Sequence, residues 1–157
     1  MIKLLNNIIY PAFLFSLFNC SSSQNQIKPD LNFNLGKINV WVDFMPGSIH
    51  SFHITGELNV NNSDASAISN LNLDSLYVYQ DGKILYNLEA DFSEIKNPNE
   101  TDLKSFDSGN YSFETKNELK LIKELDLLKT INIELILHSG SKKYFIKSEE
   151  IKIEKVY

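Results

Sequence analysis

Histidine is the residue type in this sequence best suited to chemistry near neutral pH, because it binds metals and transfers protons. The chain contains His50, His53 and His138. His50 and His53 stand three residues apart in a stretch of period-two alternation, so their side chains point to opposite faces of a strand. They cannot hold one metal ion together from that strand, and the sequence predicts no metal site and no cofactor. A periplasmic carrier of a small ligand, copper or zinc is the alternative that would use these histidines.

No spacing of nucleophiles or acids predicts catalysis. The nucleophile motif Gly-x-Ser-x-Gly is absent. Glu149 and Glu150 are adjacent, so on a strand their carboxylates face opposite ways. The six glycines are too scattered to form a phosphate-binding loop. We therefore expect a protein that is not an enzyme, with no catalytic residue.

Cys20 is the single cysteine, so the chain cannot form an internal disulfide bond. Before it comes an apolar stretch, residues 8–18, which is interrupted by Pro11 and Ser16 and preceded by the positive charge of Lys3. A membrane-spanning helix needs about 20 apolar residues, so this stretch is too short to span. It matches the apolar region of a secretory signal, which has roughly 7–15 residues.

The residues around Cys20 resemble the lipobox of bacterial lipoproteins. Leu17 stands three residues before the cysteine, and the polar run 21–26 follows it. Phe18 and Asn19 depart from the family pattern, which has small residues there. The resemblance implies that residues 1–19 are a signal peptide and that Cys20 becomes the first mature residue, with a lipidated thiol. Fatty-acyl chains such as palmitate would then anchor the protein to a membrane.

The resemblance also implies a location in the bacterial cell envelope. Serine rather than aspartate follows Cys20, and by analogy with Gram-negative sorting this favours the outer membrane, facing the periplasm. Residues 20–36 comprise the lipidated cysteine and a polar stretch with Pro29 and Gly36, which we interpret as a flexible tether. The folded domain is expected over 37–157.

The charge balance of the chain bears on whether that domain binds nucleic acid. All 15 basic residues are lysine, and 20 acids give a net charge of −5. Arginine supplies the planar fork that grips phosphate, and it is absent. Nucleic acid is therefore not an expected partner.

Period-two alternation of apolar and polar residues dominates 37–157 and predicts half-buried strands of an antiparallel sheet. Asp81-Gly82 between two such runs is a strong hairpin signal. About seven strands are expected, in an all-β fold that looks like an immunoglobulin-like antiparallel β-sandwich, with a small open barrel as the alternative. Two further features are a short helix or helical turn near 118–129 and a final strand over 143–156 that contains a β-bulge.

Two apolar residues fall on the polar phase of their strands. Trp41 alternates with Val40 and Val42, and Ile136 alternates with Leu135 and Leu137. Exposed tryptophan is enriched at binding hot spots, so both residues are candidates for a contact surface.

The sequence as a whole favours a lipid-anchored, non-catalytic envelope protein that binds or supports another protein. Its partners would be the membrane, through the anchor, and an unidentified envelope protein. A protease inhibitor is a further alternative, for which the long segment 93–104 is the candidate inhibitory loop.

Overall fold

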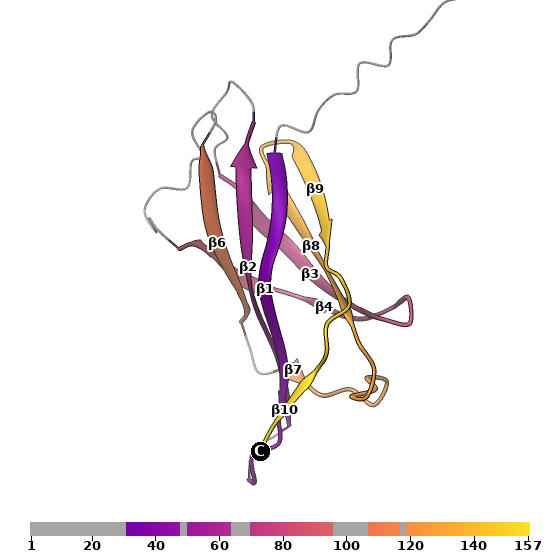
Figure 1. Cartoon of the computed structure of the whole chain (residues 1–157). Helices are drawn as coiled ribbons and strands as arrows, with labels where there is room; N and C mark the ends of the chain where they lie inside the picture. Colours follow the sequence, from indigo (N-terminus) through magenta and orange to yellow (C-terminus); the bar gives the residue numbers. More distant parts are fainter. Residues whose placement is uncertain (1–30, 48–49, 64–69, 96–106, 117–118) are drawn as a thin grey trace, which may run out of the picture.

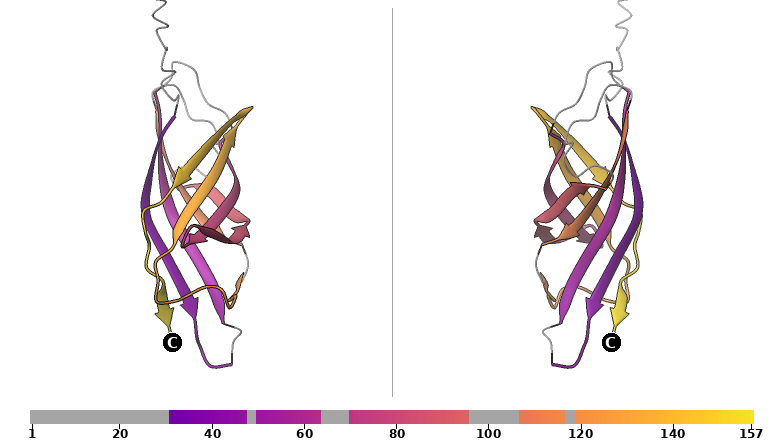
Figure 2. Two further views of the ribbon diagram at one scale, coloured as in Figure 1. Left: turned by 90° about the vertical axis from the view of Figure 1, so that its right-hand side faces the viewer. Right: turned by 90° about the vertical axis from the view of Figure 1, so that its left-hand side faces the viewer.

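The computed structural model describes residues 31–47, 50–63, 70–95, 107–116 and 119–157. This part of the chain forms β-strands and no helix, which confirms the all-β prediction (Figure 1). The strands make two sheets that face each other as two layers (Figure 2). Cys20 and the predicted signal peptide lie outside the described residues.

The first sheet, called here the β2 sheet, has the strand order β10-β1-β2-β6-β5, and β7 also pairs with β2. All its pairs are antiparallel except β1 with β10, which is parallel. Its strands are β1 (Leu31–Asp43), β2 (Ser51–Asn62), β5 (Ala90–Glu94), β6 (Ser108–Thr115), β7 (Leu119–Lys120) and β10 (Glu154–Val156).

The second sheet, called here the β8 sheet, has the order β4-β3-β8-β9 and is wholly antiparallel. Its strands are β3 (Asn72–Gln80), β4 (Lys83–Leu88), β8 (Asn132–Ser139) and β9 (Lys142–Lys147). The predicted hairpin turn at Asp81-Gly82 joins β3 to β4, and both turn residues have positive φ, 51° and 77°. That geometry is the one the dipeptide favours in a two-residue hairpin.

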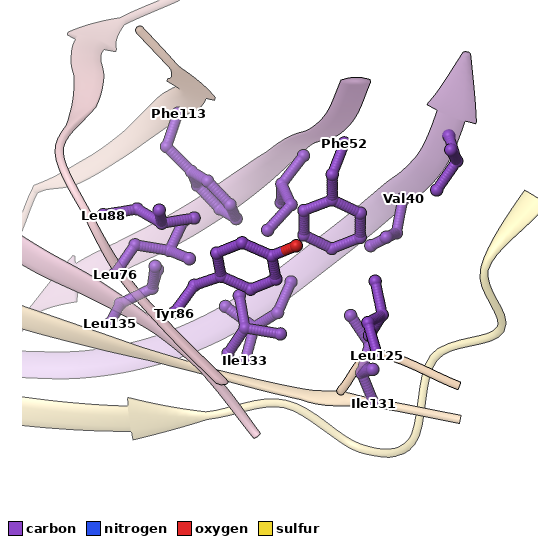
Figure 3. Packing of buried hydrophobic residues seen from close by; sticks show 13 residues of the cluster. Val40, Phe52, Leu76, Tyr86, Leu88, Phe113, Leu125, Ile131, Ile133 and Leu135 are labelled. Atoms are coloured by element: carbon purple, nitrogen blue, oxygen red, sulfur yellow. The ribbon is translucent and has the colours of Figure 1, made fainter. Parts of the chain in front are cut away.

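The core lies between the two sheets and is built by the alternation seen in the sequence. On β2, Phe52, Ile54, Leu58 and Val60 are fully buried. Phe52 stacks on Tyr86 from β4, with ring centroids 5.2 Å apart and an interplanar angle of 9° (Figure 3). Aromatic side chains from the two sheets therefore meet at the centre of the sandwich.

The folded part of the chain begins earlier than the predicted start at Lys37. Strand β1 begins at Leu31, within the segment interpreted as a tether. Leu31 and Leu35 pair with Asn62 and Leu58 of β2, so these residues belong to the sheet. The prediction gave weight to Pro29 and Gly36 and missed the apolar alternation between them.

The predicted helix near 118–129 does not form in the described residues 119–129. Strand β7 and two turns take its place, closed by hydrogen bonds from Leu125 N–H to Ile122 O and from Lys129 N–H to Asp126 O. The three-residue spacing of the apolar side chains is real, because Leu125 is buried and Ile122 packs against the core. Turns that cross the end of the sandwich satisfy the same spacing.

The final predicted strand is two strands in different sheets. β9 ends at Lys147 in the β8 sheet, and β10 pairs with β1 in the β2 sheet. The change of phase that predicted a β-bulge therefore marks a crossover between layers. An isolated bridge between Ile131 and Ile151 holds the crossing segment.

Candidate contact face

The outer face of the β8 sheet carries a group of large apolar side chains. On β3 the core-facing residues Leu76 and Val78 alternate with Tyr77 and Tyr79, which point outward and are half-buried. The same alternation on the neighbouring strands adds residues from each of them. We call the group the apolar patch; it consists of Tyr77, Tyr79, Ile84, Ile136 and Phe145.

Strand register brings the members of the apolar patch together. Ile136 of β8 lies opposite Phe145 of β9, and Tyr79 of β3 lies opposite Ile84 of β4. The rings of Tyr77 and Tyr79 tilt toward each other with centroids 6.5 Å apart. Phe145 is 64% exposed and Ile84 is 56% exposed, which is high for large apolar residues on a sheet. The patch therefore extends across all four strands of the sheet.

Polar contacts hold Tyr79 of the patch in place. The Tyr79 hydroxyl donates a hydrogen bond to the Glu134 carboxylate on β8. That bond to a carboxylate is the main reason why the pKa of Tyr79 is raised above its ordinary value. Lys147 lies over the same ring, with its Nζ atom 5.2 Å from the centroid. Tyr79 is thus held at its hydroxyl and over one face of its ring.

A charged cluster stands beside the patch, where β3, β8 and β9 meet. One oxygen of Asp74 contacts His138 Nδ1, and the other lies 3.7 Å from Lys143 Nζ. One carboxylate thus binds two basic side chains from neighbouring strands. The cluster fixes the polar rim of the outer face.

Trp41 lies on the outer face of the other sheet. It is half-buried, and its indole stacks on His53 of β2 with centroids 5.1 Å apart and an interplanar angle of 12°. The His53 ring in turn contacts the Ser51 hydroxyl through Nε2 at 2.7 Å. Trp41 and Ile136 therefore lie on opposite sides of the sandwich, so a single flat partner cannot cover both.

The outer face of the β2 sheet differs in character from that of the β8 sheet. Apart from Trp41 and its stacking partner His53, the outward side chains of its central strands are polar or charged. They include Asn39, Thr55, Glu57, Asn59, Asn110, Ser112 and Glu114. This face has the composition of an ordinary hydrated surface.

The histidines occupy three separate places. His50 packs against Phe44 with ring centroids 4.7 Å apart, next to the end of β1. His53 is on the outer face of the β2 sheet, and His138 is on the outer face of the β8 sheet. In the described part of the chain, no three His, Cys, Asp or Glu side chains gather in a way that would hold a metal ion. The predicted inhibitory segment 93–104 falls mainly on residues that the structure does not describe.

Sequence reasoning named one member of the apolar patch, Ile136, and missed the other four. The signal for the tyrosines was present, because Tyr77 and Tyr79 occupy the polar phase of a strand whose other phase is Leu76 and Val78. Phe145 could not be placed in the same way. Its strand was expected to run over 143–156, and the change of apolar phase within that range left the direction of Phe145 ambiguous.

Comparison with known proteins adds no assignment to this geometry. No family model, no curated protein and no solved structure matches the chain. Across the described ranges there is no helix of the length and apolarity that crossing a bilayer requires.

Proposed function

We propose that this protein is a non-catalytic, lipid-anchored module of the bacterial cell envelope that binds another protein through the apolar patch. The observation that carries the proposal is the contrast between the two outer faces. Contiguous exposed apolar groups on a sheet face are characteristic of contact sites, whereas scattered ones are common on any surface. The β8 sheet has such a group, and the β2 sheet does not.

The chemistry of the patch favours a folded protein as the partner. Aliphatic Ile84 and Ile136 lie beside aromatic residues, and the rim carries charges of both signs, with Asp74 and Lys143 among them. An apolar centre with a polar rim is the usual anatomy of a protein–protein interface. A partner with aliphatic side chains in its own centre would bury Phe145, the most exposed residue of the patch.

The lipid anchor is the second part of the proposal. Cys20 follows an apolar segment of signal length and precedes the first strand by a short polar stretch. Lipidation at that position would hold the sandwich close to the membrane, most simply on the periplasmic side of the outer membrane. The patch would then meet its partner in the envelope, where both are concentrated at a surface.

We also infer that the sandwich has an immunoglobulin-like topology. The order β1-β2-β6-β5 opposite β4-β3-β8-β9 supports this, since it follows the A-B-E-D and C-F-G arrangement with one strand added beside C. The loops at the two ends of the sandwich are then free to vary, while the outer sheet faces stay fixed.

Site-specific photo-crosslinking in intact cells tests the contact face. A photoreactive residue at Phe145 or Ile84 should give a discrete covalent adduct with an envelope protein. The matched positions Thr55 and Asn59 on the other sheet should give none. Adding Ile136→Asp should abolish the adduct at Phe145 while the protein stays folded by circular dichroism. Equal adducts from both faces would overturn the proposal.

Membrane fractionation tests the anchor. Cys20→Ala should abolish acyl labelling with a clickable fatty acid and change the fractionation of the protein, whereas Ser21→Ala should leave both unchanged. Undiminished labelling of the Cys20→Ala protein would refute lipidation at Cys20 and leave the contact-face proposal standing.

A further inference from the structure

Half of strand β1 presents an edge that no described strand covers. β10 pairs with β1 at Trp41, Val42 and Asp43 alone, so the stretch Leu31–Leu35 has β2 on one side and no described partner on the other. An uncovered edge offers backbone hydrogen-bonding groups to another chain. In Figure 1 this stretch is the upper end of β1.

The backbone groups that face outward can be identified from neighbouring bonds. Ile54 N–H donates to Thr115 Oγ1 and Asn62 N–H donates to Asp107 O, both on the β6 side of β2. In an antiparallel strand, every second residue directs its N–H and C=O to the same neighbouring strand. The residues of β2 at every second position from Ile54 to Asn62 therefore direct their N–H and C=O toward β6 and away from β1. Leu58 and Val60 share that phase.

The residues of β1 that pair with them therefore direct their N–H and C=O groups away from β2. Leu31, Phe33 and Leu35 pair with Asn62, Val60 and Leu58. Because these are not hydrogen-bonded pairs, the N–H and C=O groups of Leu31, Phe33 and Leu35 face the uncovered edge.

The sequence of this edge is a palindrome. Residues 31–35 read Leu-Asn-Phe-Asn-Leu and carry no charge. Antiparallel pairing of two such segments about Phe33 places leucine opposite leucine, asparagine opposite asparagine and phenylalanine opposite phenylalanine. Like side chains then face each other on both sides of the axis, which suits an isologous two-fold contact.

The other outer strands are not palindromic, and each carries charge, Lys83 on β4 and Glu154 and Lys155 on β10 among them. β9 carries Lys142, Lys143 and Lys147, which repel the same strand of a second copy, and outer strand β5 carries Asp91 and Glu94. Charged side chains are the usual means by which proteins prevent edge pairing. The β1 edge has no such protection.

Open space lies beside the edge, where apolar side chains such as Leu31, Phe33 and Ile146 line it together with lysines of β9 and charged residues of the segment 147–154. One cavity of about 550 Å³ runs between Leu31–Phe33 and β9, and another of about 630 Å³ continues along Asn34–Ile38. Phe33 and Tyr144 contact each other there, with ring centroids 5.0 Å apart. The Tyr144 hydroxyl is buried without a hydrogen-bond partner among the described residues. The space can receive apolar side chains from an added strand.

We propose that this edge binds a second copy of the chain, forming a two-fold dimer in which the Leu31–Leu35 segments pair antiparallel about Phe33. Phe33 of each copy then exchanges both backbone hydrogen bonds with its equivalent, and the leucines do the same in reverse order. Asn32 faces Asn34 of the partner subunit on the outer surface, as a non-hydrogen-bonded pair with Cα atoms about 4.5 Å apart.

Paired cysteines test the register of this dimer. Asn32→Cys and Asn34→Cys, which replace exposed residues, are co-expressed as full-length chains with two distinguishable tags. A disulfide joining both tags should form, because the facing Cα separation lies within the usual disulfide range. Either variant alone should crosslink several-fold less, since its equivalent positions lie about 7–8 Å apart on the diagonal.

The unsubstituted chain, which retains Cys20, is the control for disulfides formed through that residue. Equal crosslinking of the mixture and of the single variants would overturn the register. Absence of any disulfide beyond this control would overturn the dimer, including the case in which another segment of the same chain covers the edge.

Charge variants supply an independent measurement. The molar mass of the purified full chain in detergent, measured by light scattering over a concentration series, should rise to that of a dimer. Asn32→Lys with Asn34→Lys places like charges opposite each other and should raise the dimer dissociation constant at least about tenfold. Asn32→Lys with Asn34→Glu places opposite charges together and should leave the dimer intact. Equal dissociation constants for the two variants, or a monomer throughout for the unsubstituted chain, would overturn the proposal.

Discussion

At the scale of single residues, Gly56 shows how closely two neighbouring strands of the β2 sheet pack on their core-facing side. It lies within β2 on the core-facing side, and the ring of Phe113 from β6 sits directly against its backbone. A β-carbon at position 56 would lie 2.2 Å from the tip of that ring. The glycine is required by this close approach and not by an unusual backbone angle.

We therefore predict that Gly56→Ala destabilises the protein by about 1–3 kcal/mol, as expected for overpacking in a core. Urea denaturation followed by circular dichroism measures the change. Phe113→Leu removes the ring, so adding it to Gly56→Ala should cost less than the sum of the two single changes. Strict additivity would contradict the contact.

Tyr86 is a buried ionisable residue of the core. Burial raises the pKa of its hydroxyl, although a hydrogen bond accepted from Ile122 N–H at 3.1 Å acts in the opposite direction. The folded protein thus keeps the proton at a pH where the unfolded chain has lost it. The stabilising effect is complete below about pH 10, where a solvent-exposed tyrosine ionises, and declines as pH rises through the higher folded pKa.

Tyr86→Phe should accordingly lessen the loss of stability between about pH 10 and 11, while costing about 1–3 kcal/mol at pH 7 through the two lost hydrogen bonds, to Lys120 O and from Ile122 N–H. Urea midpoints at both pH values measure this, with Tyr157→Phe as the exposed control. A parallel decline in the Tyr86→Phe protein and the unsubstituted protein would contradict the assignment.

At the scale of elements, Gln80 explains how the segment after β7 is held without a helix. Its buried side-chain amide donates to Asp126 O at 2.9 Å, and its carbonyl oxygen accepts from Asp126 N–H at 2.8 Å. Tyr86 supplies a second attachment through Lys120 O and Ile122 N–H. Strands β3 and β4 thus fix this loop through side chains rather than through a sheet.

Gln80→Leu should destabilise the protein by about 1–3 kcal/mol, because it leaves Asp126 N–H without its partner and removes one of the two donors to Asp126 O, the other being Lys129 N–H. Hydrogen exchange at the Asp126 amide should accelerate more than exchange at the strand amides of β8. Asn87→Leu, at an exposed position of β4, is the control and should change neither quantity. Unchanged exchange at Asp126 would refute the role of Gln80.

At the scale of the whole molecule, the two hydrophobic clusters of the sandwich share their boundary. Leu35, Leu73, Phe92 and Ile146 pack against both clusters. One cluster contains Phe52 and Tyr86, and the other lies at the end where β1 begins. Because they share side chains from both sheets, neither cluster can open without exposing the other.

We expect a single cooperative unfolding transition. Trp41 fluorescence reports on β1 and β2, while far-ultraviolet circular dichroism reports on all strands, and the urea midpoints from the two should coincide. Val40→Ala, in the core beside Trp41, should shift both midpoints equally. Separate midpoints would show that the β2 sheet unfolds independently.

Much of the strand content follows from local sequence. Alternation places Phe52, Ile54 and their neighbours on one face because successive side chains of a strand point in opposite directions. Asp81-Gly82 fixes a tight hairpin because its residues adopt positive φ at low cost. These are short-range effects, so the sequence predicts them without knowledge of the partner strands.

Other features were decided by contacts between distant parts of the chain. In the segment after β7, a helix and a pair of turns would both bury the apolar side chains that recur every three residues. The hydrogen bonds of Gln80 and Tyr86 to this segment favour the turns. The change of phase after β9 is compatible with a bulge within one strand or with a crossover to the other sheet. The structure shows a crossover, because β10 pairs with β1.

The sequence by itself determined that Ile136 points away from the core, because strand phase is local. It could not determine that Phe145 lies opposite Ile136 and that Trp41 lies on the other side of the molecule, since register and layer are long-range properties. A contact face needs side chains from several strands at once. Tertiary structure alone decides which of them meet, because burial of the shared core sets how the strands are ordered and aligned.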